Sequence, residues 1–300
     1  MKDRGHILTE HRNPRSSRLD VLSVADAFDV INGEDATVAA AVAAAKEDIC
    51  RAIEFVVAAF QAGGRLIYVG AGTSGRLGVL DATECPPTFL TDPEIVQGVI
   101  AGGPEALTRS VEGAEDRGES GAEAIDQRGV GPRDLVFGIA TGGTTPFVHG
   151  AIQRAKQRGA KTVFLACVPA EQVGDAADVS IRVLTGSEVL TGSTRMKAGT
   201  ATKMVLNMVT TIAMVRLGKV HQNLMVDMDT TLNAKLIDRG TRSVQSVTGL
   251  AREAAAALLS DAGGRVKTAL VMHGNSVDRV TAERLLGAAG GNVDRVLNPI

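Results

Sequence analysis

Residues 66–76 read LIYVGAGTSGR, a short apolar run that ends in a loop of glycines and hydroxyl side chains. The same pattern recurs at residues 135–146, LVFGIATGGTTP, and at residues 179–195, VSIRVLTGSEVLTGSTR. Each run predicts a strand, and each loop leads into a helical pattern. In an open parallel sheet such loops gather at the carboxyl ends of the strands, where ligands bind. We therefore expect the three loops to converge on one pocket.

The composition of these loops predicts the chemistry of the ligand. Glycines let the backbone approach an anion, helix N-termini aim N–H groups at it, and serine and threonine hydroxyls add neutral donors. Three such loops indicate a pocket for a phosphorylated, hydroxyl-rich small molecule. The sequence thus favours a sugar phosphate as the ligand.

The rest of the chain alternates strands with helices, which predicts an α/β fold with a doubly wound parallel sheet. The expected strands are residues 65–69, 95–100, 134–140, 162–166 and 179–184. Residues 198–217 are apolar nearly all round, as in a helix buried in a core or at a subunit interface. We expect a helical region over residues 23–59 with a break at Asn32-Gly33.

We divide the chain into three parts. Residues 1–54 form an N-terminal arm, which lies on another surface over about its first 20 residues, followed by helices. Residues 55–220 form the sugar-phosphate-binding domain, and residues 221–300 a connecting segment and a small C-terminal helical domain. The pattern is wholly helical beyond Asn233, with breaks expected at Gly263-Gly264 and Gly290-Gly291.

Composition excludes several classes of function. The formal net charge of −2 offers no basic surface for nucleic acid, and with 3% aromatic residues hydrogen bonding must dominate sugar recognition over ring stacking. No apolar run approaches 18 residues, so we expect no membrane span, and the N-terminus lacks the apolar core of a signal peptide. Three unclustered cysteines suit a reducing cytosol, and we expect a cytoplasmic protein.

Two other kinds of site are less well supported. The spacing Gly70-x-Gly72-x-x-Gly75 matches a dinucleotide fingerprint, but Asp92 and Glu94 precede an apolar run instead of closing one. For Gly70, a tight turn that permits close packing remains an alternative. The five histidines show no metal-ligand spacing, so we expect no metal. We also expect no nucleotide cofactor.

Two reactive side chains have ordinary structural explanations. Cys85 has no candidate base at a recognisable distance, which favours buried packing over a nucleophile. The acidic run 112–126 can be a solvated surface. Glu115 and Glu119 are like charges four residues apart, and the run also holds three glycines, so we expect no single continuous helix there. Spacing alone does not identify Glu115 as catalytic.

Longer motifs carry a resemblance to a family. GAGTSGRL (residues 70–77) with LDATECPPTF (residues 80–89) resembles the N-acetylmuramic acid 6-phosphate etherases of the sugar isomerase (SIS) fold. The resemblance continues, in chain order, at TE-x-RNP (9–14), VEGAED (111–116), EVLTGSTRMKAGT (188–200) and NLMVD (223–227). Glucokinase regulatory proteins share this fold and several of the motifs, and are the nearest relatives without the etherase chemistry.

One loop departs from the etherase pattern. Residues 141–146 read TGGTTP where the etherases usually read ASGRTP, so Gly142 stands at the serine position and Thr144 at the arginine position. A threonine of the same loop can replace the lost hydroxyl, but no cation in this loop replaces the arginine. The hydroxyl side chain at Thr144 is more similar to the regulatory proteins than to the etherases. The same is true of Thr202, where etherases commonly carry glutamine.

The resemblance implies a carbon–oxygen lyase that cleaves the D-lactyl ether of N-acetylmuramate 6-phosphate to N-acetylglucosamine 6-phosphate and D-lactate. In the open-chain sugar, a base removes the C2 proton, an acid protonates the departing lactyl oxygen at C3, and water then adds. Two positioned carboxyl groups can perform these steps. By similarity to the family, Glu84 would be the acid and Glu115 the base.

The resemblance also implies the binding residues and the assembly. Two loops would hold the phosphate and the sugar hydroxyls, through Gly72, Thr73, Ser74, Thr141, Gly142, Thr144 and Thr145. The third loop offers Glu188, Ser193 and Lys197 as further ligand contacts, unless it serves a dimer interface instead. Family members are homodimers, and the apolar helix 198–217 is a plausible part of that interface.

An alternative function remains open from the sequence. The same pocket could belong to a non-catalytic sugar-phosphate sensor that reports its ligand to a partner protein, as the glucokinase regulatory proteins do. Retention of both Glu84 and Glu115 favours the enzyme. The altered loop at residues 141–146 favours the sensor.

Overall fold

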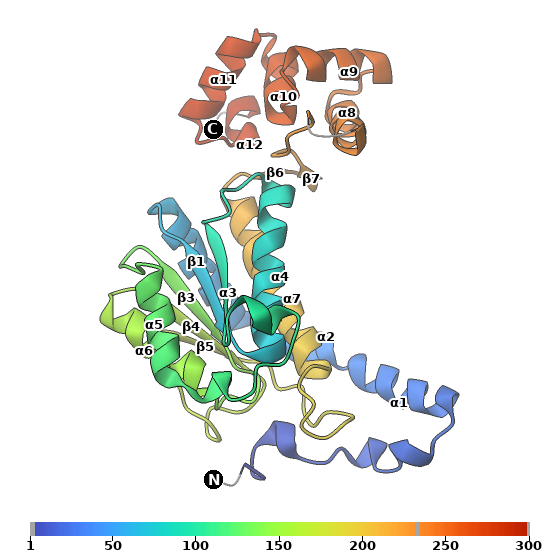
Figure 1. Ribbon diagram of the computed structural model, residues 1–300. Helices are drawn as coiled ribbons and strands as arrows, with labels where there is room; N and C mark the ends of the chain where they lie inside the picture. Colours follow the sequence, from blue (N-terminus) through green and yellow to red (C-terminus); the bar gives the residue numbers. More distant parts are fainter. Residues whose placement is uncertain (1–3, 232–233, 299–300) are drawn as a thin grey trace. The chain divides into compact units, whose positions relative to one another are not determined.

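The computed structural model describes residues 4–231 and 234–298. Its larger sheet is five-stranded and parallel (Figure 1). The strand order is β2-β1-β3-β4-β5. These strands are β1 (Leu66–Gly70), β2 (Val96–Ile100), β3 (Leu135–Ile139), β4 (Lys161–Ala166) and β5 (Val179–Arg182). The predicted doubly wound parallel sheet is confirmed, with strand ends within two residues of those expected. Every residue of β1 and β3 is buried, as expected for strands covered on both faces.

The strand order locates the binding crevice. The chain steps from β1 to β2 in one direction and returns past β1 to β3 in the other, which makes β1 and β3 the switch point of the sheet. Ligands of open α/β sheets bind outside the carboxyl ends of the strands at such a point. The loops after β1 and β3 are two of the three glycine- and hydroxyl-rich loops that we identified in the sequence.

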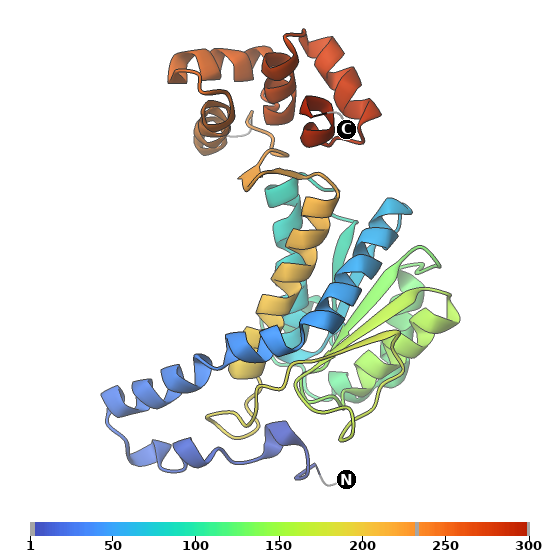
Figure 2. The same ribbon diagram turned by 180° about the vertical axis from the view of Figure 1, so that it is seen from behind.

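Helices cover both faces of the sheet (Figures 1 and 2). On one face, Ile67 and Val136 share a core with α5 and α6. On the other, Gly78 of α4 lies so close to Tyr68 that an added Cβ would come within 2.9 Å of it. The sheet helices are α3 (Lys46–Gln61), α4 (Gly72–Phe89), α5 (Gly118–Gln127), α6 (Pro146–Gln157) and α7 (Lys197–Arg216). Helix α7 is as predicted. The acidic run is also not one continuous helix, as predicted, because the 3₁₀ turn η5 (Ala114–Asp116) precedes α5.

The N-terminal segment lies on the loops at the carboxyl ends of the strands. The Asn13 side chain donates to the carbonyl of Ser187, and the Ser16 hydroxyl donates to that of Val189. The expected arm is therefore confirmed for this stretch. It contains three short 3₁₀ turns, η1 (Leu8–Glu10), η2 (Pro14–Ser16) and η3 (Leu19–Val21).

The helix break predicted at Asn32-Gly33 is wrong. Helix α1 (Val24–Asp35) passes through both residues, and the chain breaks at residues 36–37 before α2 (Val38–Ala44). Gly33 has a packing role instead, because a Cβ there would lie 3.1 Å from the Arg15 guanidinium, which reaches Glu34. A glycine inside a helix can thus mark a close approach instead of an end.

The chain forms two compact units. The first comprises the residues up to Thr83 together with Pro93–Thr210, and the second Glu84–Asp92 together with the residues from Thr211 on. The second unit has its own core, including Val244, Leu259 and Leu270. Its elements are β6 (Val220–His221), β7 (Leu224–Met225), α8 (Ala234–Thr248), α9 (Arg252–Asp261), α10 (Val266–Asn275), α11 (Arg279–Ala288) and α12 (Val293–Leu297).

The helical C-terminal pattern is confirmed from Ala234 on, and Asn233 itself lies outside the described residues. Both predicted glycine breaks are also confirmed: Gly263-Gly264 separates α9 from α10, and Gly290-Gly291 separates α11 from α12. The three-part division at residues 54 and 220 stays a prediction. Among the described helices, none is long and apolar enough to cross a membrane.

Candidate functional site

The turn after β1 is a very short connection between a strand and a helix. Only Ala71 separates β1 from α4, whose first residue Gly72 has a φ of +53°. A Cβ on Gly70 would lie 2.6 Å from the backbone nitrogen of Gly75, so the strand and helix backbones are in direct contact. The free N–H groups of the first turn of α4 therefore lie at the carboxyl edge of the sheet.

The turn after β3 is longer and is held by a histidine. The backbone N–H of Gly143 donates to the carbonyl of Ala140 at 2.7 Å, with a φ of +79° at Gly143. His149 on α6 places its Nε2 2.7 Å from the Gly143 carbonyl oxygen. Thr145 then precedes Pro146, the first residue of α6. These two contacts hold the Thr141–Thr145 loop, which leads directly into the N-terminus of α6.

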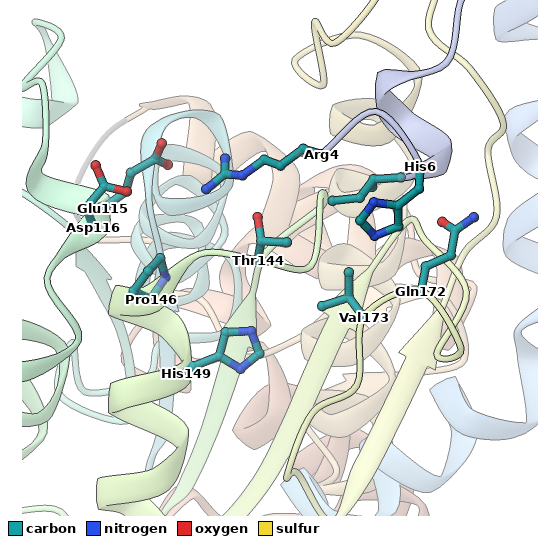
Figure 3. A pocket seen from close by; sticks show the side chains of 10 residues that line it. Arg4, His6, Glu115, Asp116, Thr144, Pro146, His149, Gln172 and Val173 are labelled. Atoms are coloured by element: carbon teal, nitrogen blue, oxygen red, sulfur yellow. The ribbon is translucent and has the colours of Figure 1, made fainter. Parts of the chain in front are cut away.

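Two cavities meet at η5. The larger, about 1290 Å³, is lined by Arg4, His6, Ile7, Glu115, Asp116, Thr144, Pro146, His149, Gln172 and Val173 (Figure 3). The smaller, about 220 Å³, includes Gly72, Arg76, Arg109 and Glu115 in its lining. Glu115, an exposed residue, lines both cavities and so lies between the turn after β1 and the turn after β3.

The structure thus brings together three of the residues that the resemblance implied: Gly72, Thr144 and Glu115. Other candidates from the first two loops lie beside them without lining either cavity. Thr73 packs against the third loop's helix, because a Cβ on Gly199 would lie 3.6 Å from its methyl carbon. Ser74 and Thr141 are buried, and Gly142 and Thr145 are half-buried.

The third loop uses its charged groups inside the protein. The Glu188 carboxylate accepts the backbone N–H groups of Lys197 at 3.0 Å and Ala198 at 2.9 Å, and so caps the start of α7. Burial raises the pKa of Glu188 despite these donors. The Lys197 ammonium is 3% exposed and lies 2.6 Å from a carboxylate oxygen of Glu34. Neither side chain lines the two cavities, and a ligand-binding role for Glu188, Lys197 or the half-buried Ser193 stays a prediction.

Glu84 is exposed and also lies outside the lining of the two cavities. It lies on α4, twelve residues after Gly72. It begins the Glu84–Asp92 stretch that belongs to the second unit. Cys85 beside it is buried, as expected for a packing role.

Comparison with known proteins gives the family. The SIS domain model matches residues 119–212, and that of the glucokinase regulatory protein N-terminal SIS domain matches residues 48–156. The N-acetylmuramic acid 6-phosphate etherase of Trichormus variabilis is 57% identical over 293 residues, 98% of this chain and 95% of the relative. That of Crocosphaera subtropica is 54% identical over 297 residues, 99% and 97% of the two chains. The chain belongs to the N-acetylmuramic acid 6-phosphate etherase family.

A solved structure supports the fold independently. A phosphoheptose isomerase from Francisella tularensis superposes with a TM-score of 0.51 at 16% identity, covering 64% of this chain and 98% of that one. At this identity the likeness shows the SIS fold and nothing about activity.

Several cavity residues were missed by the sequence analysis. Arg76 donates through Nε to the carbonyl of Leu107 and through Nη2 to that of Arg109, which fixes both arginines at the smaller cavity. Arg76 is the last residue of the first loop, where its charge already suited a small phosphate monoester, so only Arg109 of this pair was missed. Arg4 and Gln172 had no local signal, because the contact of Leu8 with Gln172 that holds this corner of the larger cavity joins residues 164 positions apart in the chain.

The geometry gives no support to the alternative sites. Glu94 comes before β2, and the strand runs into Ala101-Gly102, so no acidic residue closes it as a dinucleotide site requires. Within residues 4–231 and 234–298, no cluster of three or more histidine, cysteine or acidic side chains could hold a metal ion.

Proposed function

We propose that this protein cleaves the D-lactyl ether of N-acetylmuramic acid 6-phosphate, giving N-acetylglucosamine 6-phosphate and D-lactate. The observation that carries the proposal is the position of Glu115 between two cavities, one at the N-terminus of α4 and one at the Thr144 loop. The names of the relatives support the etherase over the sugar-phosphate sensor.

The smaller cavity suits the phosphate. The first-turn N–H groups of α4 favour an anion at Gly72, and Arg76 and Arg109 add positive charge in the same lining. A phosphate there would leave the sugar extending past Glu115 toward Thr144. In that orientation Glu115 removes the proton on C2, which the open-chain aldehyde at C1 acidifies.

The proton donor to the lactyl oxygen is proposed to be Glu84 of a second copy. Carbon 2 and the ether oxygen on carbon 3 are neighbours in the substrate, whereas Glu84 lines neither of the two cavities that Glu115 lines. A homodimer would bring the two carboxyl groups together by pairing Glu115 of one chain with Glu84 of the other. Helix α7 offers exposed apolar side chains at Met208, Ile212 and Val215 for such an interface.

The direct test is D-lactate release from N-acetylmuramic acid 6-phosphate by the purified protein. We expect Glu115→Gln to lower turnover by at least about 10²-fold, the usual effect of removing a positioned base, with little change in substrate binding. Glu119→Gln is the matched control, because Glu119 is exposed on α5 and lines neither cavity. Absence of D-lactate with the unmodified protein would refute the proposed function.

A further inference from the structure

Arg4 reaches the larger cavity because the residues after it are firmly anchored. Ile7 is 3% exposed and belongs to the core that includes β1 and α6. The backbone N–H of Leu8 donates to the side chain of Gln172 at 2.9 Å, and that of Ile7 donates to the carbonyl of Arg4 at 2.9 Å. This turn fixes the backbone of Arg4 at the edge of the cavity.

Arg4 lines a cavity that carries more carboxylates than basic lysine or arginine side chains. Two carboxylates, Glu115 and Asp116, line the cavity, and Arg4 is the one lysine or arginine among its described lining residues. Figure 3 shows the Arg4 side chain extending toward the space between Thr144 and Glu115. Within the described part of the chain, its guanidinium makes no hydrogen bond or ion pair. A guanidinium held over an acidic cavity without a protein partner favours an anionic group on the ligand.

The proposed substrate carries two anions, on different sides of the base. Its phosphate, on carbon 6, fits the smaller cavity with Arg76 and Arg109, whereas Arg4 lines the larger cavity beyond Glu115. The lactyl ether on carbon 3 ends in a carboxylate, which matches the planar fork of a guanidinium. We propose that Arg4 binds the carboxylate of the lactyl group, an inference that rests on the proposed function.

This contact would let the protein bind the substrate more tightly than the product. N-acetylglucosamine 6-phosphate keeps the phosphate but has lost the lactyl carboxylate, so Arg4 contributes to binding of the ether alone. The guanidinium also offsets the repulsion that a bound carboxylate would feel from Glu115 and Asp116.

The test is calorimetry on Glu115→Gln protein, in which turnover is suppressed, with and without Arg4→Gln. We expect Arg4→Gln to weaken binding of N-acetylmuramic acid 6-phosphate by about tenfold to a hundredfold, the usual loss for a hydrogen-bonded charge. Binding of N-acetylglucosamine 6-phosphate should change less than about twofold. Arg4→Lys should restore part of the lost affinity, and Arg18→Gln, an exposed arginine of the same segment outside the cavity, should leave both affinities unchanged.

The two proposals fail separately. Equal weakening of both sugars would mean that Arg4 binds the phosphate, and unchanged binding of both would mean that it binds neither group; either result overturns the inference about Arg4. The proposed function fails instead if protein with Glu115 and Arg4 intact releases no D-lactate, whatever the calorimetry shows.

Discussion

Thr9 is a buried hydroxyl residue without a partner beside the altered loop. Its side chain is fully buried, and its Oγ1 has no hydrogen-bond partner among the described residues. A Cβ added to Gly142 would lie 3.7 Å from that oxygen, and outside the adjoining residues no other atom would lie within 4 Å of this Cβ. The sequence difference at Gly142, where the etherase pattern carries serine, therefore leaves an unpaired polar atom inside this protein.

Gly142→Ser should consequently stabilise the protein. Its hydroxyl can reach Thr9 Oγ1 and pair it, which is worth about 1 kcal/mol in unfolding free energy. Urea unfolding compares this variant with Gly142→Ala, which reports the loss of glycine flexibility alone. The advantage of serine over alanine should vanish in a Thr9→Val background. Equal stability of the serine and alanine variants with Thr9 present would contradict the pairing.

At this scale the sequence predicts only what is local. The loops containing Gly72 and Thr144 are recognisable because glycine and hydroxyl side chains next to an apolar run carry their own signal. Arg4 and Arg109 are exposed arginines in unpatterned stretches. Their places in the cavities depend on contacts with residues far along the chain, Gln172 and Arg76 respectively, which no local pattern reveals.

A buried ion pair connects helix α1, in the N-terminal part of the chain, to helix α7. The Glu34 carboxylate at the end of α1 accepts the Lys197 ammonium at the start of α7, and also the Arg15 guanidinium at 3.0 Å. Burial alone would raise the pKa of Glu34, but Lys197, with Asn13 and Arg15, outweighs it and holds this pKa below its ordinary value. The same contact explains why Lys197 is unavailable to the cavities.

This contact predicts an acid-sensitive attachment of the N-terminal segment. Because the pKa of Glu34 is lowered in the folded protein, its stabilisation is complete above the ordinary glutamate pKa, about 4.3, and is lost as pH falls through the folded value. Glu34→Gln should cost about 3 kcal/mol at pH 7, since it leaves Lys197 buried without its carboxylate.

The measurement is urea unfolding at pH 7 and at successively lower pH below about 4.3. The stability gap between the unmodified protein and Glu34→Gln should narrow as pH falls. The exposed Glu47→Gln on α3 serves as the control and should show no such gap at any pH. A gap that stays constant down to the acid limit of folding would show that ionisation of Glu34 is not what holds the segment.

At the scale of the whole molecule, the sequence predicted the sheet and left the assembly to be tested. The central strands β1, β3 and β4 were recognisable because strands covered on both faces read as nearly continuous apolar runs, as in Leu135–Ile139. Helix α7 reads as apolar all round, yet Ala201 and Val205 are buried while Met208 and Ile212 are exposed in the single chain. An apolar pattern does not distinguish a core from an interface, because both remove the same side chains from water.

Subunit mixing tests whether a complete site needs two chains. Glu84→Gln and Glu115→Gln proteins should each be nearly inactive. If Glu84 of one chain serves Glu115 of the other, a mixed dimer contains one fully intact site and one doubly altered site. Random exchange of equal amounts makes half of the dimers mixed, so the mixture should recover roughly a quarter of the unmodified D-lactate release per chain.

The control mixes Glu115→Gln protein with the Glu84→Gln/Glu115→Gln double variant, a pair that exchanges subunits equally well but can form no intact site. This second mixture should stay inactive. Native mass spectrometry of differently tagged chains verifies that exchange has taken place in both. If the first mixture contains mixed dimers and yet remains as inactive as its parents, the two glutamates do not act across the subunit boundary. Glu84 would then have to be replaced as the proposed acid by a titratable side chain that lines a cavity with Glu115. The candidates are His6, Asp116 and His149 in the larger cavity and Glu112 in the smaller one.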